Sequence, residues 1–199
     1  MLIKQSMKHP APSTRMETKP GMPSDEELME AFQDGDSSAM NALFDRHAKG
    51  VHAFLSRMVQ DRTLADDLLQ TTFLSVVRSA DRYQRGLPFT PWLLTVAGNA
   101  ARDTLRRKNL KVEVAASDEE RRAHEPSVES TPSDPGERRR IEQAFAKLPA
   151  QQREAVILHK LEGLSFEQIA SMLDITSTAA RIRAHRGYER LKELLEEPH

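Results

Sequence analysis

Residues 164–195 contain a short helical pattern, a tight turn and a second helical pattern that carries several arginines. The first helix is expected to begin at Ser165, because Gln168 stands three residues later, in the position that completes a capping box. A turn follows at 174–177, and the second helix runs from there to Leu195. This order and spacing predict a helix-turn-helix unit.

The second helix of this unit separates its apolar side chains from its basic ones. A period of 3.6 residues gathers Ala180, Ala184 and Tyr188 on a stripe that can face a core, and it directs Ile182 to the exposed side. In the major groove of duplex DNA, guanidinium groups bind phosphates or guanine edges, and an apolar group can contact a thymine methyl. A solvated basic helix is the alternative interpretation. The DNA-binding interpretation assigns the duplex contacts to Ser177, Thr178, Arg181, Ile182, Arg183 and Arg186.

The net charge of −1 conceals two oppositely charged segments. Residues 99–111 hold five basic side chains and one acidic one, whereas residues 112–136 hold seven acidic and two basic ones. The first segment therefore adds a second basic element to the chain. The acidic segment lacks periodicity, which is typical of a flexible linker.

Helical periodicity without a convincing strand signal predicts an all-α fold of two small helical domains joined by a flexible acidic linker, the second of them a helix-turn-helix domain. Ser24, with Glu27 in its capping-box position, marks the start of the first domain. Four prolines and few apolar residues precede it, which predicts a disordered tail. The expected order is a tail at 1–23, a first domain at 24–108, a linker at 109–136 and a second domain at 137–195.

Several classes of protein find no support in the sequence. There is no cysteine, which excludes disulfides and thiolate chemistry. The adjacent carboxylates of Asp66 and Asp67 would point about 100° apart on a helix, and His47 and His52 are poorly spaced to share a metal ion. We expect no enzyme activity, no catalytic residue, no cofactor and no metal. No apolar run reaches the roughly 18 residues of a membrane span, so we expect a cytoplasmic protein without membrane insertion.

The helix expected over residues 64–80 leaves one face outside its apolar stripe. That face combines charged and polar groups with a single leucine. One exposed leucine is common on soluble proteins, but an apolar centre with a polar rim is also typical of a protein-docking surface, and the sequence leaves both interpretations open. The face consists of Asp66, Asp67, Gln70, Thr71, Leu74 and Arg78.

A loop and a helix over residues 83–108 bring aromatic and basic side chains together. Thr90 is expected to cap the helix, with Pro91 in its first turn. Aromatic rings can stack on unpaired bases while arginines follow the DNA backbone. A tryptophan near a helix start is also a common core residue, so both roles are open for Trp92. The expected contacts with melted DNA are Tyr83, Arg85, Phe89, Trp92, Asn99, Arg102, Arg106 and Arg107.

These motifs, taken in order, resemble the extracytoplasmic-function (ECF) class of bacterial RNA polymerase sigma factors. The resemblance covers residues 24–195 and depends on the combination of motifs, since each one alone is weak. The residues that carry it are the Asp25 to Gly35 helix with Asp36, Ala39 to Asp45, Ala65 to Leu74, Phe89 to Leu93, Asn99 to Arg107, Leu148-Pro149 with Arg153 and Leu158, Gly163 to Ser165, and Gln168 to Ala170.

The resemblance implies a two-domain initiation factor that binds core RNA polymerase at the β′ coiled coil and the β flap. Asp66, Asp67, Gln70 and Leu74 would contact the β′ coiled coil. Residues 83–107 would recognise and hold open the promoter −10 element, and Arg181, Arg183 and Arg186 would contact the −35 element. The family also implies an anti-sigma factor as a regulatory partner.

The sequence departs from the family pattern at three places. Thr71 stands where relatives commonly have glutamate, Thr95 where many have a basic residue, and residues 178–182 differ from the usual start of the recognition helix. The alternative function is a conventional helix-turn-helix regulator that acts without polymerase. That alternative leaves residues 83–107 and the docking face without a role.

Overall fold

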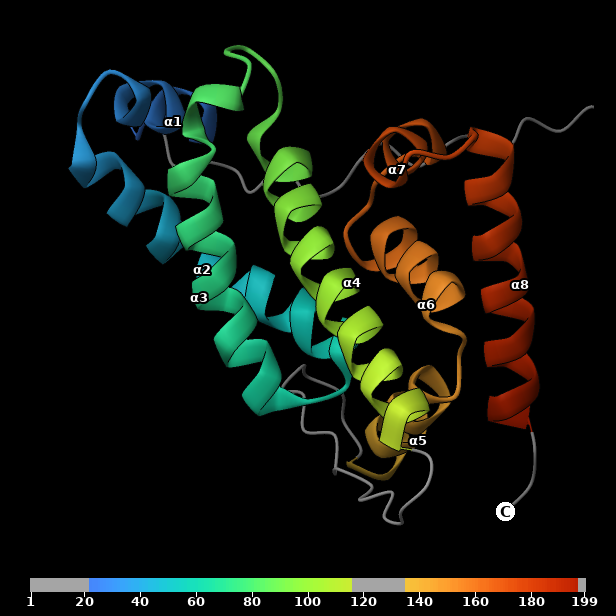
Figure 1. Ribbon diagram of the computed structural model, residues 1–199. Helices are drawn as coiled ribbons and strands as arrows, with labels where there is room; N and C mark the ends of the chain where they lie inside the picture. The colour runs from blue at the N-terminus through green and yellow to red at the C-terminus, as the bar shows by residue number, and fades with distance from the viewer. Residues whose placement is uncertain (1–21, 116–134, 197–199) are drawn as a thin grey trace, which may run out of the picture.

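Every regular element within the described residues, 22–115 and 135–196 of a computed structural model, is helical (Figure 1). The predicted all-α fold is confirmed. The first half contains α1 (Asp25–Gln33), α2 (Ser37–Val59), α3 (Arg62–Arg78), the 3-10 turn η1 (Ala80–Arg82) and α4 (Phe89–Ala115). The second half contains α5 (Pro135–Ala146), α6 (Ala150–Val156), the π-helical turn η2 (Ile157–Leu161), α7 (Phe166–Leu173) and α8 (Ser177–Glu196).

The two helix starts predicted from capping boxes are confirmed. The backbone N–H of Glu27 donates to Ser24 Oγ at 3.1 Å, and the Ser24 N–H donates to Glu27 Oε2 at 2.6 Å. Ser165 and Gln168 make the same reciprocal pair at 3.2 and 2.9 Å before α7. Each pair satisfies backbone donors that a helix start leaves without intrahelical partners.

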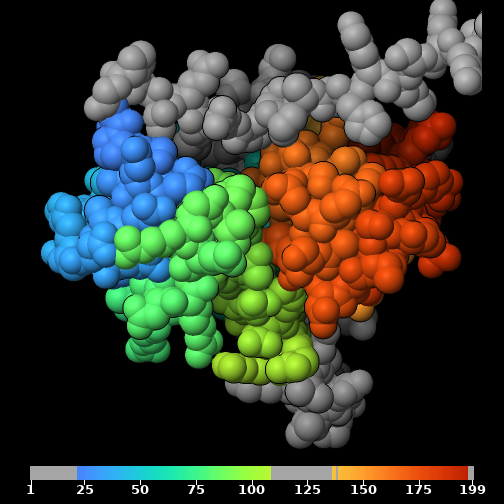
Figure 2. Space-filling view, turned by 90° about the horizontal axis from the view of Figure 1, so that it is seen from above, coloured from blue at the N-terminus to red at the C-terminus, as the bar shows by residue number. Residues whose placement is uncertain are grey.

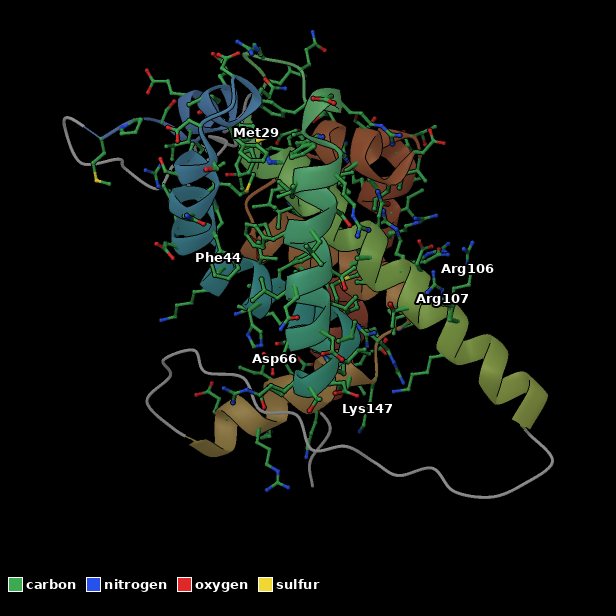
Figure 3. All side chains as sticks on the ribbon, turned by 60° about the vertical axis from the view of Figure 1, so that its left-hand side comes forward. Met29, Phe44, Asp66, Arg106, Arg107 and Lys147 are labelled. Carbon is green, nitrogen blue, oxygen red and sulfur yellow. The ribbon has the colours of Figure 1, made fainter. Side chains whose placement is uncertain are left out.

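The core of the first half forms around α2, against which α1, α3 and α4 pack. Leu43, Phe54 and Leu55 of α2 are completely buried, as are Met29 of α1 and Phe89 of α4. Met29 lies among the helices of this half (Figure 3). Burial of each large apolar side chain contributes roughly 1.5–3 kcal/mol, so this cluster fixes how α3 and α4 are held.

Helix α4 is longer at both ends than the sequence predicts. It begins at Phe89, so the prediction of Thr90 as its N-cap is wrong. The Phe89 N–H instead donates to Glu26 Oε1 of α1 at 3.0 Å, a partner 63 residues away. At its other end α4 continues to Ala115, through residues expected to belong to the linker. Residues 116–134 of that linker, and 1–21 of the expected tail, lie outside the described residues.

The helix-turn-helix unit of α7 and α8 packs closely on α6. Asp174 ends α7 in a left-handed conformation with φ 52°, which turns the chain toward α8. Gly187 of α8 faces α6 so closely that a Cβ there would meet Val156 Cγ2 at 2.5 Å and Gln152 O at 3.1 Å. Only glycine allows α8 this approach, which sets the position of its outer face.

The two halves are packed against each other rather than separated. Figure 1 shows α4 between the remaining helices of the first half and the group of α6, α7 and α8, and Figure 2 shows the surfaces of the two halves in contact. One hydrophobic core continues from the first half into Ile157, Leu158 and Ile169 of the second. Across the described ranges, no helix has the length and apolar content needed to span a membrane.

Candidate nucleic-acid and protein interfaces

The outer face of α3 is open to solvent along its whole length. Asp61 caps the helix by accepting the Leu64 N–H at 3.0 Å. Leu74 is 56% exposed at the centre of the face, with charged or polar neighbours around it. The residues predicted to form this face, Asp66, Asp67, Gln70, Thr71, Leu74 and Arg78, are all exposed.

The α3 face is more apolar than the sequence interpretation allowed. Val77, three residues after Leu74 and therefore next to it on the helix surface, is 44% exposed. Phe44 of α2 is also exposed, and its ring packs against that of Phe73 with centroids 4.8 Å apart. In the sequence, the three-residue spacing of Leu74 and Val77 is the pattern that indicates this apolar pair.

Tyr83 and Phe89 do not present rings to solvent. Both are buried, and their ring centroids lie 6.0 Å apart in an edge-to-face arrangement. The expectation that these two rings stack on bases therefore differs from the structure, because the hydrophobic core of the first half encloses them. Their role here is to join the loop before α4 to that core.

Helix α1 holds this loop through polar contacts. Gln33 Nε2 donates to the carbonyl oxygens of Ala80 at 2.8 Å and Tyr83 at 2.9 Å. The Tyr83 hydroxyl donates to the Leu87 carbonyl. Burial, followed by the nearby Glu26, Glu30 and Asp25 carboxylates, raises the pKa of Tyr83 to about 12, so the hydroxyl stays a proton donor.

Trp92 combines the two roles that the sequence left open. Its ring packs edge-on against Tyr83, with centroids 5.2 Å apart and an interplanar angle of 63°. The side chain is nevertheless only half-buried. Trp92 therefore packs on the core and keeps part of its surface exposed to solvent.

Arg85 lies on the exposed tip of the loop and forms an ion pair with Asp34. This contact raises the pKa of Arg85 and lowers that of Asp34, the hydrogen bond between them being the main cause. Both side chains are more than half exposed, and pairs of this kind contribute little to stability. Arg85 thus remains accessible to a ligand.

The outer face of α4 divides into an open part and an occupied part. Arg106 and Arg107 are exposed and project away from the helix (Figure 3). Arg102 instead donates from Nη1 to Glu154 Oε1 of α6 and from Nη2 to Asn99 Oδ1. Arg106 also pairs with Asp103 at 3.2 Å, but both of these side chains are more than half exposed, so of these two ion pairs the Arg102 pair is the one that ties α4 to the second half.

Glu154 is an unusual partner because its side chain is only 5% exposed. Burial raises the pKa of this carboxyl, and the charges of Arg102, Arg183 and Arg153 oppose the rise. Arg183, expected on the outer side of α8, is half-buried near this carboxylate. Sequence periodicity could not identify Glu154, because its partner on α4 is 52 residues away.

The outer face of α8 is largely free. Thr178, Arg181, Ile182 and Arg186 are exposed, and Ser177 is half-buried at the first turn. Ile182 is 46% exposed, as the helical period predicts. The Arg181 guanidinium lies 5.3 Å from the Phe166 ring centroid, which supports it over the first helix of the unit.

The chain is similar to known proteins along both halves. Family models for Sigma-70 region 2 and for Sigma-70, region 4 match residues 43–110 and 138–191. RNA polymerase sigma factor CarQ of Myxococcus xanthus is 52% identical over 169 residues, which cover 85% of this chain and 96% of CarQ. ECF RNA polymerase sigma factor SigE of Mycolicibacterium smegmatis is 34% identical, with 87% of this chain and 70% of that protein covered.

Solved structures share the fold at lower sequence identity. The sigma factor RpoE from Bartonella quintana, in complex with the anti-sigma factor NepR, has a TM-score of 0.66 at 24% identity, covering 80% of this chain and 98% of that one. CnrH, in complex with the cytosolic domain of CnrY, has a TM-score of 0.64 at 24% identity, covering 86% and 97%. Together with the two family models and the identity to CarQ, these similarities show that the chain belongs to the ECF class of the sigma-70 family, the factors that direct promoter-specific initiation of transcription.

Proposed function

We propose that the chain binds core RNA polymerase through the outer face of α3 and reads promoter DNA with α4 and α8. The observation that carries this proposal is the α3 face, on which all six predicted residues are exposed around Leu74 and Val77. Protein interfaces typically combine such an apolar centre with a polar rim. The family resemblance assigns this face to the β′ coiled coil and adds a contact between the second half and the β flap.

For the −10 element, we propose contacts from the loop and from α4. The side chains with accessible polar or aromatic surface are Arg85, Trp92, Asn99, Arg102, Arg106 and Arg107. Trp92 is the base-stacking group, because it is only half-buried and packs against Tyr83 of the loop. Tyr83 and Phe89 act indirectly by holding the loop in place. Arginines then follow the backbone of the opened strand.

For the −35 element, we propose that α8 lies in the major groove. Thr178, Arg181, Ile182 and Arg186 form its free face, with Ser177 at its start. Arginine contacts give affinity through phosphates and guanine edges, and Ile182 contacts a thymine methyl. Arg183 is half-buried near Glu154, and it joins this set when DNA phosphates replace the Glu154 carboxylate as its partner.

We also propose an anti-sigma factor as the regulatory partner. Of the solved structures named above, RpoE was determined in complex with the anti-sigma factor NepR, and CnrH in complex with the cytosolic domain of CnrY. A protein that covers the α3 face would prevent polymerase binding, and the exposed Leu74 and Val77 offer it an apolar centre.

Reconstitution with core polymerase tests the proposal directly. Core polymerase of Myxococcus xanthus, the source of CarQ, would be mixed with the chain and with a library of random-sequence promoters. Sequencing of the run-off transcripts should reveal two enriched elements, one near −10 and one near −35. Transcripts without either element, or no co-purification with core polymerase, would contradict the proposal and favour a regulator that acts alone.

A further inference from the structure

The contact between the two halves includes residues proposed to bind DNA. Helix α4 packs against α7, and Arg102 of α4 pairs with Glu154 of α6, while the exposed Asn99 accepts a hydrogen bond from Arg102 within α4. Arg102 and Asn99 lie outside the buried side of α4, which includes Leu93, Leu94 and Ala97. The contact therefore uses the face of α4 that a promoter strand would need.

Gly98 shows how closely the second half approaches. A Cβ at Gly98 would lie 3.2 Å from Arg102 Nη1, 3.4 Å from Glu154 Oε1 and 3.8 Å from Met172 Cε. Atoms of α4, α6 and α7 thus meet at one point, and a larger side chain there would push them apart. The absence of a side chain at this position keeps the Arg102–Glu154 pair close to the helix backbone.

The charges at this contact favour the conformation in which the two halves are packed against each other, which we call the closed form. Glu154 is almost completely buried, and Arg102 is 32% exposed, so the pair is shielded from much of the solvent. An ionised carboxylate is costly to bury without partners, and removing one member of such a pair leaves the other uncompensated. Opening of the contact would take Arg102 away from Glu154 and leave the carboxylate with Arg183 and Arg153.

We propose that the free chain holds itself closed through Glu154, which binds Arg102 and keeps its guanidinium from promoter DNA until the halves separate. This inference rests on the proposed role of α4 in −10 binding. In contrast, the α3 face is exposed in the same conformation. The closed chain can therefore meet core polymerase before its DNA-binding surfaces are complete.

Distance measurements on the free chain test the closure without polymerase or DNA. The chain contains no cysteine, so Asp45→Cys in α2 and Lys192→Cys in α8, both at exposed positions, allow selective spin labelling. Double electron–electron resonance should give one narrow distance distribution. Glu154→Gln is expected to raise the population at longer distances by about fivefold, because the ion pair is lost.

Gly98→Leu provides a second variant that leaves all charges in place. The leucine should separate α4 from α6 and α7 and give the same shift to longer distances. Gly50→Leu in α2 is its control, since a Cβ at Gly50 has no neighbour within 4 Å. Glu193→Gln, an exposed glutamate in α8, is the charge control for Glu154→Gln. Circular dichroism confirms that each variant is folded.

Binding of a fluorescent oligo(dT) strand tests whether closure restricts DNA access. Glu154→Gln should bind severalfold more tightly than Glu193→Gln, and the gain should vanish in Glu154→Gln/Arg102→Gln. A broad distribution in the parent chain, or unchanged distances in both folded variants, would overturn the closure. Opening without any gain in oligo(dT) affinity would support the ion pair and overturn the assignment of Arg102 to DNA.

Discussion

The outer faces of α3 and α4 differ in how much of each is free before any partner arrives. All six predicted residues on α3 are exposed, and Asp66, which pairs with another helix, does so with His52 of α2 in the same half. Of the eight residues predicted along the loop and α4, Tyr83 and Phe89 are buried and Arg102 is paired with Glu154 of the second half. The face proposed to bind polymerase is thus exposed throughout, whereas the face proposed to bind DNA is partly buried or paired within the chain.

The difference follows from the neighbours of the two helices. Helix α3 packs on α2, α4 and the 3-10 turn η1, and the side chains of its outer face are exposed. Helix α4 packs on the first half with one side and meets α7 with another. Because α4 lies between the two halves, the exposure of its outer face depends directly on whether the halves are in contact.

The largest expected effect is on stability, at the buried residue Phe89. Phe89→Ala should lower the free energy of unfolding by about 3–5 kcal/mol, because a fully buried ring leaves a cavity. Urea denaturation followed by circular dichroism measures it. Trp92→Ala, at a half-buried position, should lower the free energy of unfolding by a clearly smaller amount. Equal losses would mean that the indole is as much a core residue as Phe89.

The α3 face is tested by Leu74→Arg. We expect affinity for core polymerase to fall about 30-fold, or about 2 kcal/mol, because a charge replaces the apolar centre of the interface. Leu87→Arg is the matched control, since Leu87 is similarly exposed but lies on the loop before α4. If both variants bind core polymerase as the parent does, the α3 face is an ordinary solvated surface.

The position of α8 depends on Gly187, which lies against α6. Gly187→Ala should destabilise the protein by about 1–3 kcal/mol, because the new methyl group would overlap Val156. Gly50→Ala should instead stabilise it by about 0.5–1 kcal/mol, as alanine favours a helix and the site is open. Thermal unfolding of the two variants should therefore shift in opposite directions.

Trp92→Ala also separates DNA opening from polymerase binding. Loss of one stacking platform should reduce open-complex formation about tenfold, while core affinity changes little. Permanganate footprinting and core-binding titrations provide the two readouts. A parallel decrease in both would indicate that Trp92 serves the fold alone.

The smallest effect is expected at Ile182. Ile182→Ser should weaken the preference for thymine at one −35 position about fivefold, or about 1 kcal/mol, by removing a methyl contact. A panel of promoter variants measures the preference, with His185→Ser, an exposed position on the same helix, as the control. An unchanged preference at every −35 position would contradict the assignment of Ile182 to the groove.

The features that the sequence predicted correctly are local ones. The capping boxes at Ser24 and Ser165 depend on residues three positions apart, and the exposure of Leu74 and Ile182 follows from helical periodicity. Because these patterns involve no distant partner, they can be recognised in the sequence alone.

The features that the sequence did not reveal depend on distant contacts. Glu26 accepts the Phe89 N–H across 63 residues and moves the start of α4, and Gln33 holds the loop that contains the buried Tyr83. Glu154 reaches Arg102 across 52 residues. No periodic pattern encodes such pairs, because each needs the fold to bring its members together.

The packing of α7 on α4 has a consequence for promoter spacing. While the halves touch, side-chain contacts within the chain determine the separation between the two helices proposed to read DNA. When the halves are separated on an assembled polymerase, the positions of the polymerase surfaces that hold them would instead set the preferred spacing between the −10 and −35 elements. The same chain on a polymerase with differently placed docking surfaces should accept a different distance between its two promoter elements.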